Sequence, residues 1–201
     1  MTQKAEETEV AIMEATSNAV CRHGYADVTM QDIADEFEKS KSLLHYHYDT
    51  KEDLFISFLE YLVDQFEDQL EIWIEGDAPP EERLREYIDW FAVEPDETER
   101  ASLHLALLEM RSQAQHNERI REQFRRSDQM ARSAFISLIE EGQETGRFDP
   151  SIEISELARL SFVAMDGARA RQVTLDEPGY SEAVADTLYT LLIEHLENPG
   201  E

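Results

Sequence analysis

The sequence predicts an all-α protein of about nine helices, with a small N-terminal domain of three helices (residues 1–51) and a larger C-terminal helical domain (residues 52–201). Apolar residues recur at helical spacing, and glycines and prolines fall mainly where helices would end. No convincing run of alternating apolar and polar residues predicts a strand. A chain of 201 residues can bury a substantial core and suits two unequal domains.

The N-terminal segment predicts three helices of falling length, over residues 6–23, 29–37 and 40–48. Two helix starts are expected where Thr29 and Thr50 each stand three residues before an aspartate, the spacing of a capping pair. Three short helices can share one core. The core residues that we expect here are Ile12, Ala15, Ala19, Met30, Ile33, Ala34, Leu44 and Leu54.

The second and third predicted helices are separated by only two or three residues, around Glu38 and Lys39. Such a short joint is typical of the helix-turn-helix, in which the second helix of the pair enters the major groove of DNA. The sequence therefore predicts that residues 40–48 form a DNA-reading helix.

The overall charge argues against this interpretation, because 18 lysines and arginines oppose 45 aspartates and glutamates and leave a net charge of −27. Such a chain repels nucleic acid at low salt. The lysines, however, are unevenly placed. Three of the four, Lys39, Lys41 and Lys51, fall within residues 39–51, where Asp49 is the only acidic residue. This lysine island has a local charge of +2 and is interleaved with side chains that can hydrogen-bond phosphate.

An acidic, lysine-poor composition resembles that of proteins from halophiles, which keep molar salt in the cytoplasm. The Debye length there falls to about 3 Å, so self-repulsion is largely screened. We therefore expect a halophilic, cytoplasmic protein. The polar N-terminus and the lack of an apolar run of roughly 18 residues predict neither a signal peptide nor a membrane span. The single cysteine, Cys21, excludes an internal disulfide.

The N-terminal segment contains one ordered set of residues at specific spacings: Gly24-Tyr25, Thr29, Asp32-Ile33-Ala34, Ser40-Lys41-Ser42-Leu43-Leu44-His45-Tyr46-His47-Tyr48 and Lys51-Glu52-Asp53-Leu54. This set resembles the DNA-binding domain of the TetR family of transcriptional regulators. The chain departs from the family pattern at three positions: Glu38 stands in place of the usual glycine, His45 in place of a tyrosine, and Tyr48 in place of a phenylalanine.

The resemblance implies a repressor that binds palindromic double-stranded DNA as a homodimer and responds to a small-molecule effector. It implies that Thr29 and Lys51 bind phosphate, each near a helix N-terminus whose free N–H groups also attract anions. Leu44 and Tyr48 are expected in the core. The residues expected to face the groove are Lys39, Lys41, Ser42, His45, Tyr46 and His47.

The last two predicted long helices, over residues 152–172 and 181–196, each carry two apolar stripes and therefore need partners on two sides. A four-helix interface between two protomers would satisfy both stripes, and the TetR resemblance implies the same. The alternative, that both stripes are used inside one protomer, stays open. Asp149 and Pro150 could serve as N-cap and first residue of a helix here.

A ligand site in the larger domain is suggested by aromatic and titratable residues on predicted helices. His104 has leucines three and four positions later, which places its ring on an apolar helix face. A carboxylate and aromatic rings around one cavity would favour a cationic ligand. Residues 103–143 also distantly resemble the C-terminal domain of choline-responsive TetR-type repressors. The candidate ligand-binding residues are Trp73, Trp90, His104, Phe162 and Asp166.

An enzyme is disfavoured, because no histidine follows a glutamate by three residues and the sequence has no His-Glu-x-x-His, glycine-rich phosphate loop or nucleophile elbow. We expect no metal site and no cofactor. A second alternative is an acidic helical adaptor that kept the fold and lost DNA binding. The lysine island favours DNA binding over this alternative.

Overall fold

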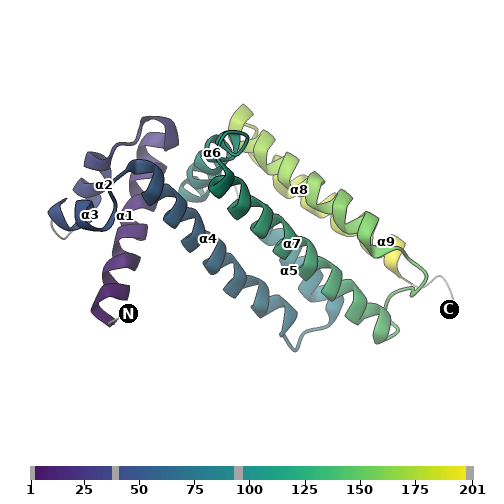
Figure 1. Cartoon of the computed structure of the whole chain (residues 1–201). Helices are drawn as coiled ribbons and strands as arrows, with labels where there is room; N and C mark the ends of the chain where they lie inside the picture. The colour runs from purple at the N-terminus through teal and green to yellow at the C-terminus, as the bar shows by residue number, and fades with distance from the viewer. Residues whose placement is uncertain (1–2, 38–40, 93–96, 198–201) are drawn as a thin grey trace. The chain divides into compact units, whose positions relative to one another are not determined.

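The computed structural model describes residues 3–37, 41–92 and 97–197, and over these ranges it contains nine α-helices and no strand (Figure 1). The all-α prediction is confirmed. The helices are α1 (Gln3–Asp27), α2 (Met30–Glu36), α3 (Lys41–His47), α4 (Lys51–Ile74), α5 (Pro80–Phe91), α6 (Thr98–Gln113), α7 (Glu118–Glu144), α8 (Ile154–Leu175) and α9 (Tyr180–Leu196).

The chain divides into two compact units. Unit 1 combines residues 1–64 with 98–124, and unit 2 combines residues 65–97 with 125–201. Helices α4 and α7 therefore contribute residues to both units. This division by packing differs from a boundary at Lys51, because α6 packs closely against α1. The functional boundary predicted at Lys51 stays a prediction.

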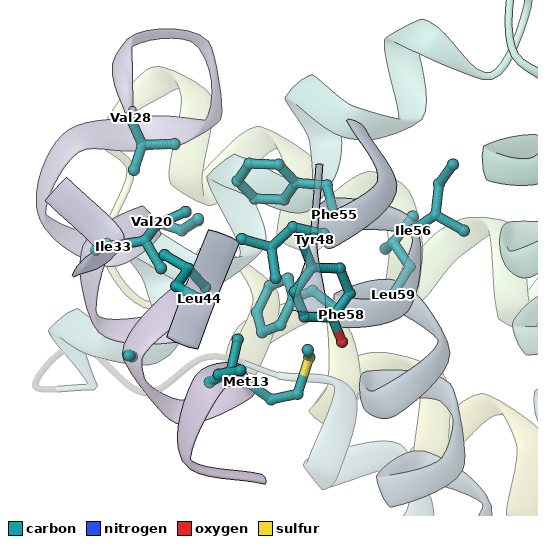
Figure 2. Packing of buried hydrophobic residues seen from close by; sticks show 14 of the residues in the cluster. Met13, Val20, Val28, Ile33, Leu44, Tyr48, Phe55, Ile56, Phe58 and Leu59 are labelled. Atoms are coloured by element: carbon teal, nitrogen blue, oxygen red, sulfur yellow. The ribbon is translucent and has the colours of Figure 1, made fainter. Parts of the chain in front are cut away.

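The core of unit 1 gathers apolar side chains from α1, α2, α3, α4 and α6. Figure 2 shows part of this core, where Met13 of α1, Leu44 of α3 and Phe58 of α4 point toward one another. Of the eight core residues expected in the N-terminal segment, seven are buried and Met30 is half-buried. This core fixes the short helices α2 and α3 against the longer α1 and α4.

Side-chain caps set the starts of α2 and α4. The backbone N–H of Asp32 donates to the Thr29 hydroxyl (3.2 Å), and the Thr29 N–H donates to the Asp32 carboxylate (2.8 Å). At α4, the Asp53 N–H donates to the Thr50 hydroxyl (3.1 Å) in the same way. Hydrogen bonds from the two threonines hold the pKa of each aspartate below its ordinary value. Both predicted helix starts are confirmed.

Unit 2 is built around α5, whose inner face is fully buried against α8 and α9 and against residues of α7. Leu84 and Ile88 have no exposed surface, and the buried Tyr87 hydroxyl donates to the Ala131 carbonyl oxygen (2.9 Å). On α8 the buried stripe consists mostly of small side chains, which allows α9 to pack closely. This packing leaves the opposite faces of α8 and α9 exposed within one chain.

The segment between α7 and α8 differs from the prediction made for Asp149 and Pro150. Helix α8 begins at Ile154 with Glu153 as its N-cap residue, so the predicted helix start is wrong. The Asp149 carboxylate instead accepts from the Ser151 N–H (2.8 Å), and the backbone N–H of Asp149 donates to the Leu196 carbonyl oxygen (2.8 Å). The aspartate therefore caps a turn that is tied to the end of α9.

Candidate functional site

Helix α3 has one buried and one exposed face. Leu44 is fully buried on the inner face, and Tyr48, directly after the helix, is also buried, so both core assignments are confirmed. Tyr46 is 83% exposed, the largest exposed fraction of any large hydrophobic side chain in the described part of the chain. The residues exposed on this short segment are Ser42, His45, Tyr46 and His47.

Of the three lysines in the lysine island, the structure describes the side chain of Lys51 alone. Lys39 lies outside the described residues, and so does the side chain of Lys41, the first residue of α3. Thr29 is exposed, and its hydroxyl donates to the Asp32 carboxylate (2.7 Å) within the cap of α2. The phosphate contacts predicted for these residues stay predictions.

The ammonium group of Lys51 is engaged inside unit 1. Its Nζ donates to the carbonyl oxygens of Tyr25 (2.8 Å) and Ala26 (3.4 Å), and it lies 5.2 Å and 5.5 Å from the ring centroids of Tyr25 and Phe55. Burial lowers the pKa of Lys51, an effect that nearby carboxylates oppose. The phosphate contact predicted for this side chain therefore competes with two internal hydrogen bonds.

One residue of this region was not predicted. Glu109 of α6 accepts hydrogen bonds from the backbone N–H groups of Tyr25 and Ala26. These are the same two residues whose carbonyl oxygens accept from Lys51. The two partners are 84 and 83 residues away in the sequence. No local spacing or periodicity could have indicated this contact.

The outer faces of α8 and α9 are apolar and exposed in one chain. Leu160 and Val163 of α8 are 66% and 62% exposed, and Leu191 of α9 is 59% exposed. An open groove at one end of these helices is lined by Leu157, Leu160 and Val163 together with polar side chains, His195 among them. The two-stripe prediction is confirmed to this extent: one stripe of each helix is buried in the protomer, and the other carries exposed apolar residues.

Four of the five candidate ligand residues belong to unit 2, where three lie in a connected set of aromatic rings. Trp90 stacks on Phe66 at 5.1 Å between ring centroids, and Trp73 meets Trp90 edge-on at 5.7 Å. Phe91 in turn contacts Trp90 at 5.2 Å and Phe162 at 6.3 Å. The structure therefore brings Trp73, Trp90 and Phe162 into one aromatic cluster.

The charged candidates are placed differently. Asp166 lies 3.6 Å from the guanidinium group of Arg169, and that guanidinium lies 5.5 Å from the ring centroid of Phe91. A cation of the chain itself thus already lies near both the carboxylate and an aromatic ring. His104 is half-buried on α6 in unit 1. A site shared by His104 and Asp166 stays a prediction.

The described residues show neither a group of metal-binding side chains nor a helix that could span a membrane. Among residues 3–37, 41–92 and 97–197, no three histidine, cysteine, aspartate or glutamate side chains are grouped so that they could hold a metal ion. Over the same ranges, no helix has the length and apolar character that crossing a bilayer requires.

Comparison with known proteins gives matches over both halves of the chain. The family model described as bacterial regulatory proteins, tetR family, matches residues 12–58, and the model of the BetI-type transcriptional repressor C-terminal domain matches residues 80–197. A curated relative, the HTH-type transcriptional repressor NicS of Pseudomonas putida, is 28% identical over 99 residues. That match spans 47% of this chain and 46% of NicS, so less than half of the relative is represented.

Solved structures extend the similarity to almost the whole chain. A TetR transcription regulator from Haloarcula marismortui is 37% identical, with a TM-score of 0.85 over 96% of this chain and 100% of that chain. A putative transcriptional regulator from Saccharomonospora viridis, solved in complex with choline, is 22% identical, with a TM-score of 0.79 over 96% and 99% of the two chains. The second similarity shows the fold alone. Because the BetI-type model covers more than half of the sequence and the Haloarcula marismortui regulator matches nearly all of it, the chain belongs to the TetR family of transcriptional regulators.

Proposed function

We propose that the protein is a dimeric, ligand-responsive repressor that acts in the cytoplasm, binds a palindromic DNA operator through α3 and is released by a small-molecule effector. The observation that carries the DNA-binding part is the exposed polar face of α3 over its buried Leu44. Family membership supports the proposal, since TetR regulators are typically DNA-binding repressors with a ligand-binding C-terminal domain. We assign it no enzymatic activity, because TetR regulators are generally non-enzymatic.

In this proposal α3 lies in the major groove, where its hydroxyl and imidazole groups hydrogen-bond to base edges and phosphates. Lys51 contributes mainly through the N-terminus of α4, since its ammonium group is engaged with two carbonyl oxygens. The proposed DNA-contacting residues are Thr29, Lys39, Lys41, Ser42, His45, Tyr46, His47 and Lys51.

The test is selection of bound fragments from the host genome in molar KCl, followed by affinity measurements on a selected fragment. Tyr46→Ala should weaken binding by about tenfold or more, the usual effect of losing one specific base contact. The control is Ile72→Ala, which removes an exposed side chain from α4, outside both α3 and the faces of α8 and α9, and should leave the affinity unchanged. Failure of the wild-type protein to bind any fragment at any KCl concentration would favour the acidic adaptor instead.

The salt dependence of binding provides a second test. Three freely available lysines per protomer would release counterions from DNA and make affinity fall steeply as salt rises. One of them, Lys51, is engaged inside unit 1, and in molar salt the gain from counterion release is small. We expect a much shallower salt slope than three lysines would give, or a reversed one. A steep loss of affinity with rising KCl would contradict this part of the proposal.

We propose that the exposed faces of α8 and α9 form the dimer interface. Leu160, Val163 and Leu191 give these faces an apolar surface that a symmetry-related copy could cover. Val163→Glu should convert the dimer to a monomer in analytical ultracentrifugation. The matched control is Ile72→Glu, because Ile72 is 64% exposed but lies on α4. A wild-type monomer would instead support the alternative in which the stripes are used within one chain.

For the effector we propose a cationic ligand that contacts Asp166 and the aromatic cluster. The BetI-type match supports this choice, as does the choline in the complex of the Saccharomonospora viridis regulator, although a Bacillus subtilis regulator of the same fold was solved with stearoyl-CoA. Because Arg169 already lies beside Asp166 and Phe91, an incoming cation must displace its guanidinium group. Removing Arg169 should therefore strengthen the binding of such a ligand.

Choline is the probe that we would use, with tryptophan fluorescence as the readout, because Trp73 and Trp90 both belong to unit 2. Asp166→Ala should lose affinity by about tenfold or more, whereas Arg169→Met should gain affinity. Unchanged affinity in Asp166→Ala would dispose of the cation site. Loss of the cation-site proposal would leave the DNA-binding proposal intact.

A further inference from the structure

The short turn that ends α1, from the break at Gly24 to Asp27, is held by charged side chains of two other helices. Gly24 has φ 75° and ψ 161°, which ends the helical conformation and redirects the N–H groups that follow. The N–H groups of Tyr25 and Ala26 donate to the same carboxylate oxygen of Glu109 on α6, at 2.9 Å and 3.2 Å. Glu109 therefore satisfies two backbone donors that the break in α1 redirects.

The carbonyl groups of the same two residues are held by α4. Lys51 Nζ donates to the Tyr25 oxygen at 2.8 Å and to the Ala26 oxygen at 3.4 Å. A carboxylate from α6 and an ammonium group from α4 thus engage the N–H and C=O groups of one dipeptide. All four backbone polar groups of the dipeptide therefore have a side-chain partner from another helix, and these contacts fix its position.

The position of this turn determines where the DNA-reading helices begin. Val28, two residues after Ala26, is buried in the core of unit 1, and Thr29 is the N-cap of α2. Helix α2 packs in turn against α3, which carries the exposed Tyr46. A displacement at Tyr25 and Ala26 would pass through Thr29 and α2 to the DNA-facing side chains.

We propose that Glu109 is a positioning residue for DNA binding, although it lies outside residues 12–58, which match the family's DNA-binding domain. The inference rests on the proposed function, because it concerns how α3 is oriented for DNA. It also makes a claim about the turn itself that can be tested without DNA. The DNA-binding segment then depends on a side chain supplied by α6, and both belong to the same compact unit.

Two substitutions distinguish the effect of where the Glu109 side-chain oxygen lies from the effect of the negative charge of its carboxylate. Glu109→Gln keeps a side-chain oxygen at the same reach and removes the charge. Glu109→Asp keeps the charge but shortens the side chain by one methylene, so that one oxygen can no longer reach both N–H groups. If Glu109 acts by holding the turn, the glutamine variant should behave like wild type and the aspartate variant like Glu109→Ala.

The experiment combines amide hydrogen exchange with DNA affinity in the full chain. In Glu109→Ala and Glu109→Asp, exchange at Tyr25 and Ala26 should be faster by about tenfold or more. Affinity for a selected genomic fragment should fall by about tenfold, equivalent to about 1.4 kcal/mol. Glu109→Gln should stay within about twofold of wild type. Glu122→Ala, which removes one exposed glutamate from α7, controls for the change in net charge.

Each outcome decides the proposal. Equal losses of affinity in Glu109→Gln and Glu109→Ala would show that charge matters and would overturn positioning. Unchanged exchange and affinity in Glu109→Asp would overturn it as well, even if Glu109→Ala does not fold. If wild type binds no fragment, the proposed function fails. Exchange in Glu109→Asp still tests, without DNA, whether Glu109 holds the turn, so the two failures can be told apart.

Discussion

Replacing Arg83 with methionine should destabilise the protein more than any other single charge removal in unit 2. The Arg83 side chain is 3% exposed. It donates to the carbonyl oxygens of Trp73 (3.0 Å) and Ile74 (2.9 Å) at the end of α4 and of Ala78 (2.7 Å) in the next turn. It also pairs with Glu141 of α7. One guanidinium group therefore caps α4 and connects it to α5 and α7.

The expected loss follows from these partners. Net contributions of hydrogen bonds to a charged group are about 1.5–3 kcal/mol each, but such contributions to one side chain are not additive. Leaving a buried acceptor without its donor typically costs about 1–3 kcal/mol, and with three carbonyl oxygens affected we expect Arg83→Met to cost about 3–5 kcal/mol. The ion pair is the smaller part, because Glu141 is 42% exposed and screened by solvent. Glu141→Gln should cost less than about 1 kcal/mol.

Urea unfolding at one fixed KCl concentration, followed by circular dichroism and tryptophan fluorescence, measures both variants. Methionine keeps most of the arginine stem, so the difference reports mainly on the lost hydrogen bonds. The slope of the unfolding free energy against urea should stay unchanged. An Arg83→Met variant within about 1 kcal/mol of wild type would refute the reasoning. Equal losses in the two variants would show that the ion pair, and not the capping of α4, dominates.

Three further predictions concern stability. Gly142→Ala should cost about 1–3 kcal/mol in thermal unfolding, because an added Cβ would lie 2.0 Å from the buried Phe148 ring, and Phe148→Leu in the same chain should relieve part of that loss. Burial raises the pKa of Tyr87, so the unfolding free energy should decrease as pH rises above about 10. Tyr87→Phe should show a smaller decrease over that range, and equal decreases in both proteins would contradict this assignment. The melting temperature should be higher in molar KCl than in dilute buffer, since a net charge of −27 is screened there, and the reverse order would rule out a halophilic protein.

The N-terminal helices could be predicted because their signals are local. Thr29 and Thr50 cap helices three residues before an aspartate, and this spacing is visible in the sequence. Leu44 and Ile33 are buried as expected, since helical periodicity places them on inner faces. The same periodicity separated the buried and exposed stripes of α8 and α9.

Contacts between distant segments left no comparable signal. Arg83 and Glu141 are 58 residues apart, and nothing in the spacing of either indicates the pairing. Asp149 shows how a local signal can mislead, because the same aspartate can cap a helix or a turn. Here the neighbouring Phe148 is buried, and the Asp149 N–H donates to the Leu196 carbonyl oxygen. These two contacts fix a turn at Asp149, and α8 begins only after it.

The acidity of the chain makes the placement of a few residues decisive for DNA binding. A basic protein can hold DNA through many interchangeable phosphate contacts, and an error in one of them changes affinity little. With a net charge of −27 this protein has few such phosphate contacts to offer. In molar salt, counterion release adds little to the affinity for DNA. In the proposed function, binding then depends on shape and on hydrogen bonds from α3, which are sensitive to small displacements. Fixing the turn at Tyr25 through both Glu109 and Lys51 is consistent with that requirement, even though it occupies an ammonium group that could otherwise bind phosphate.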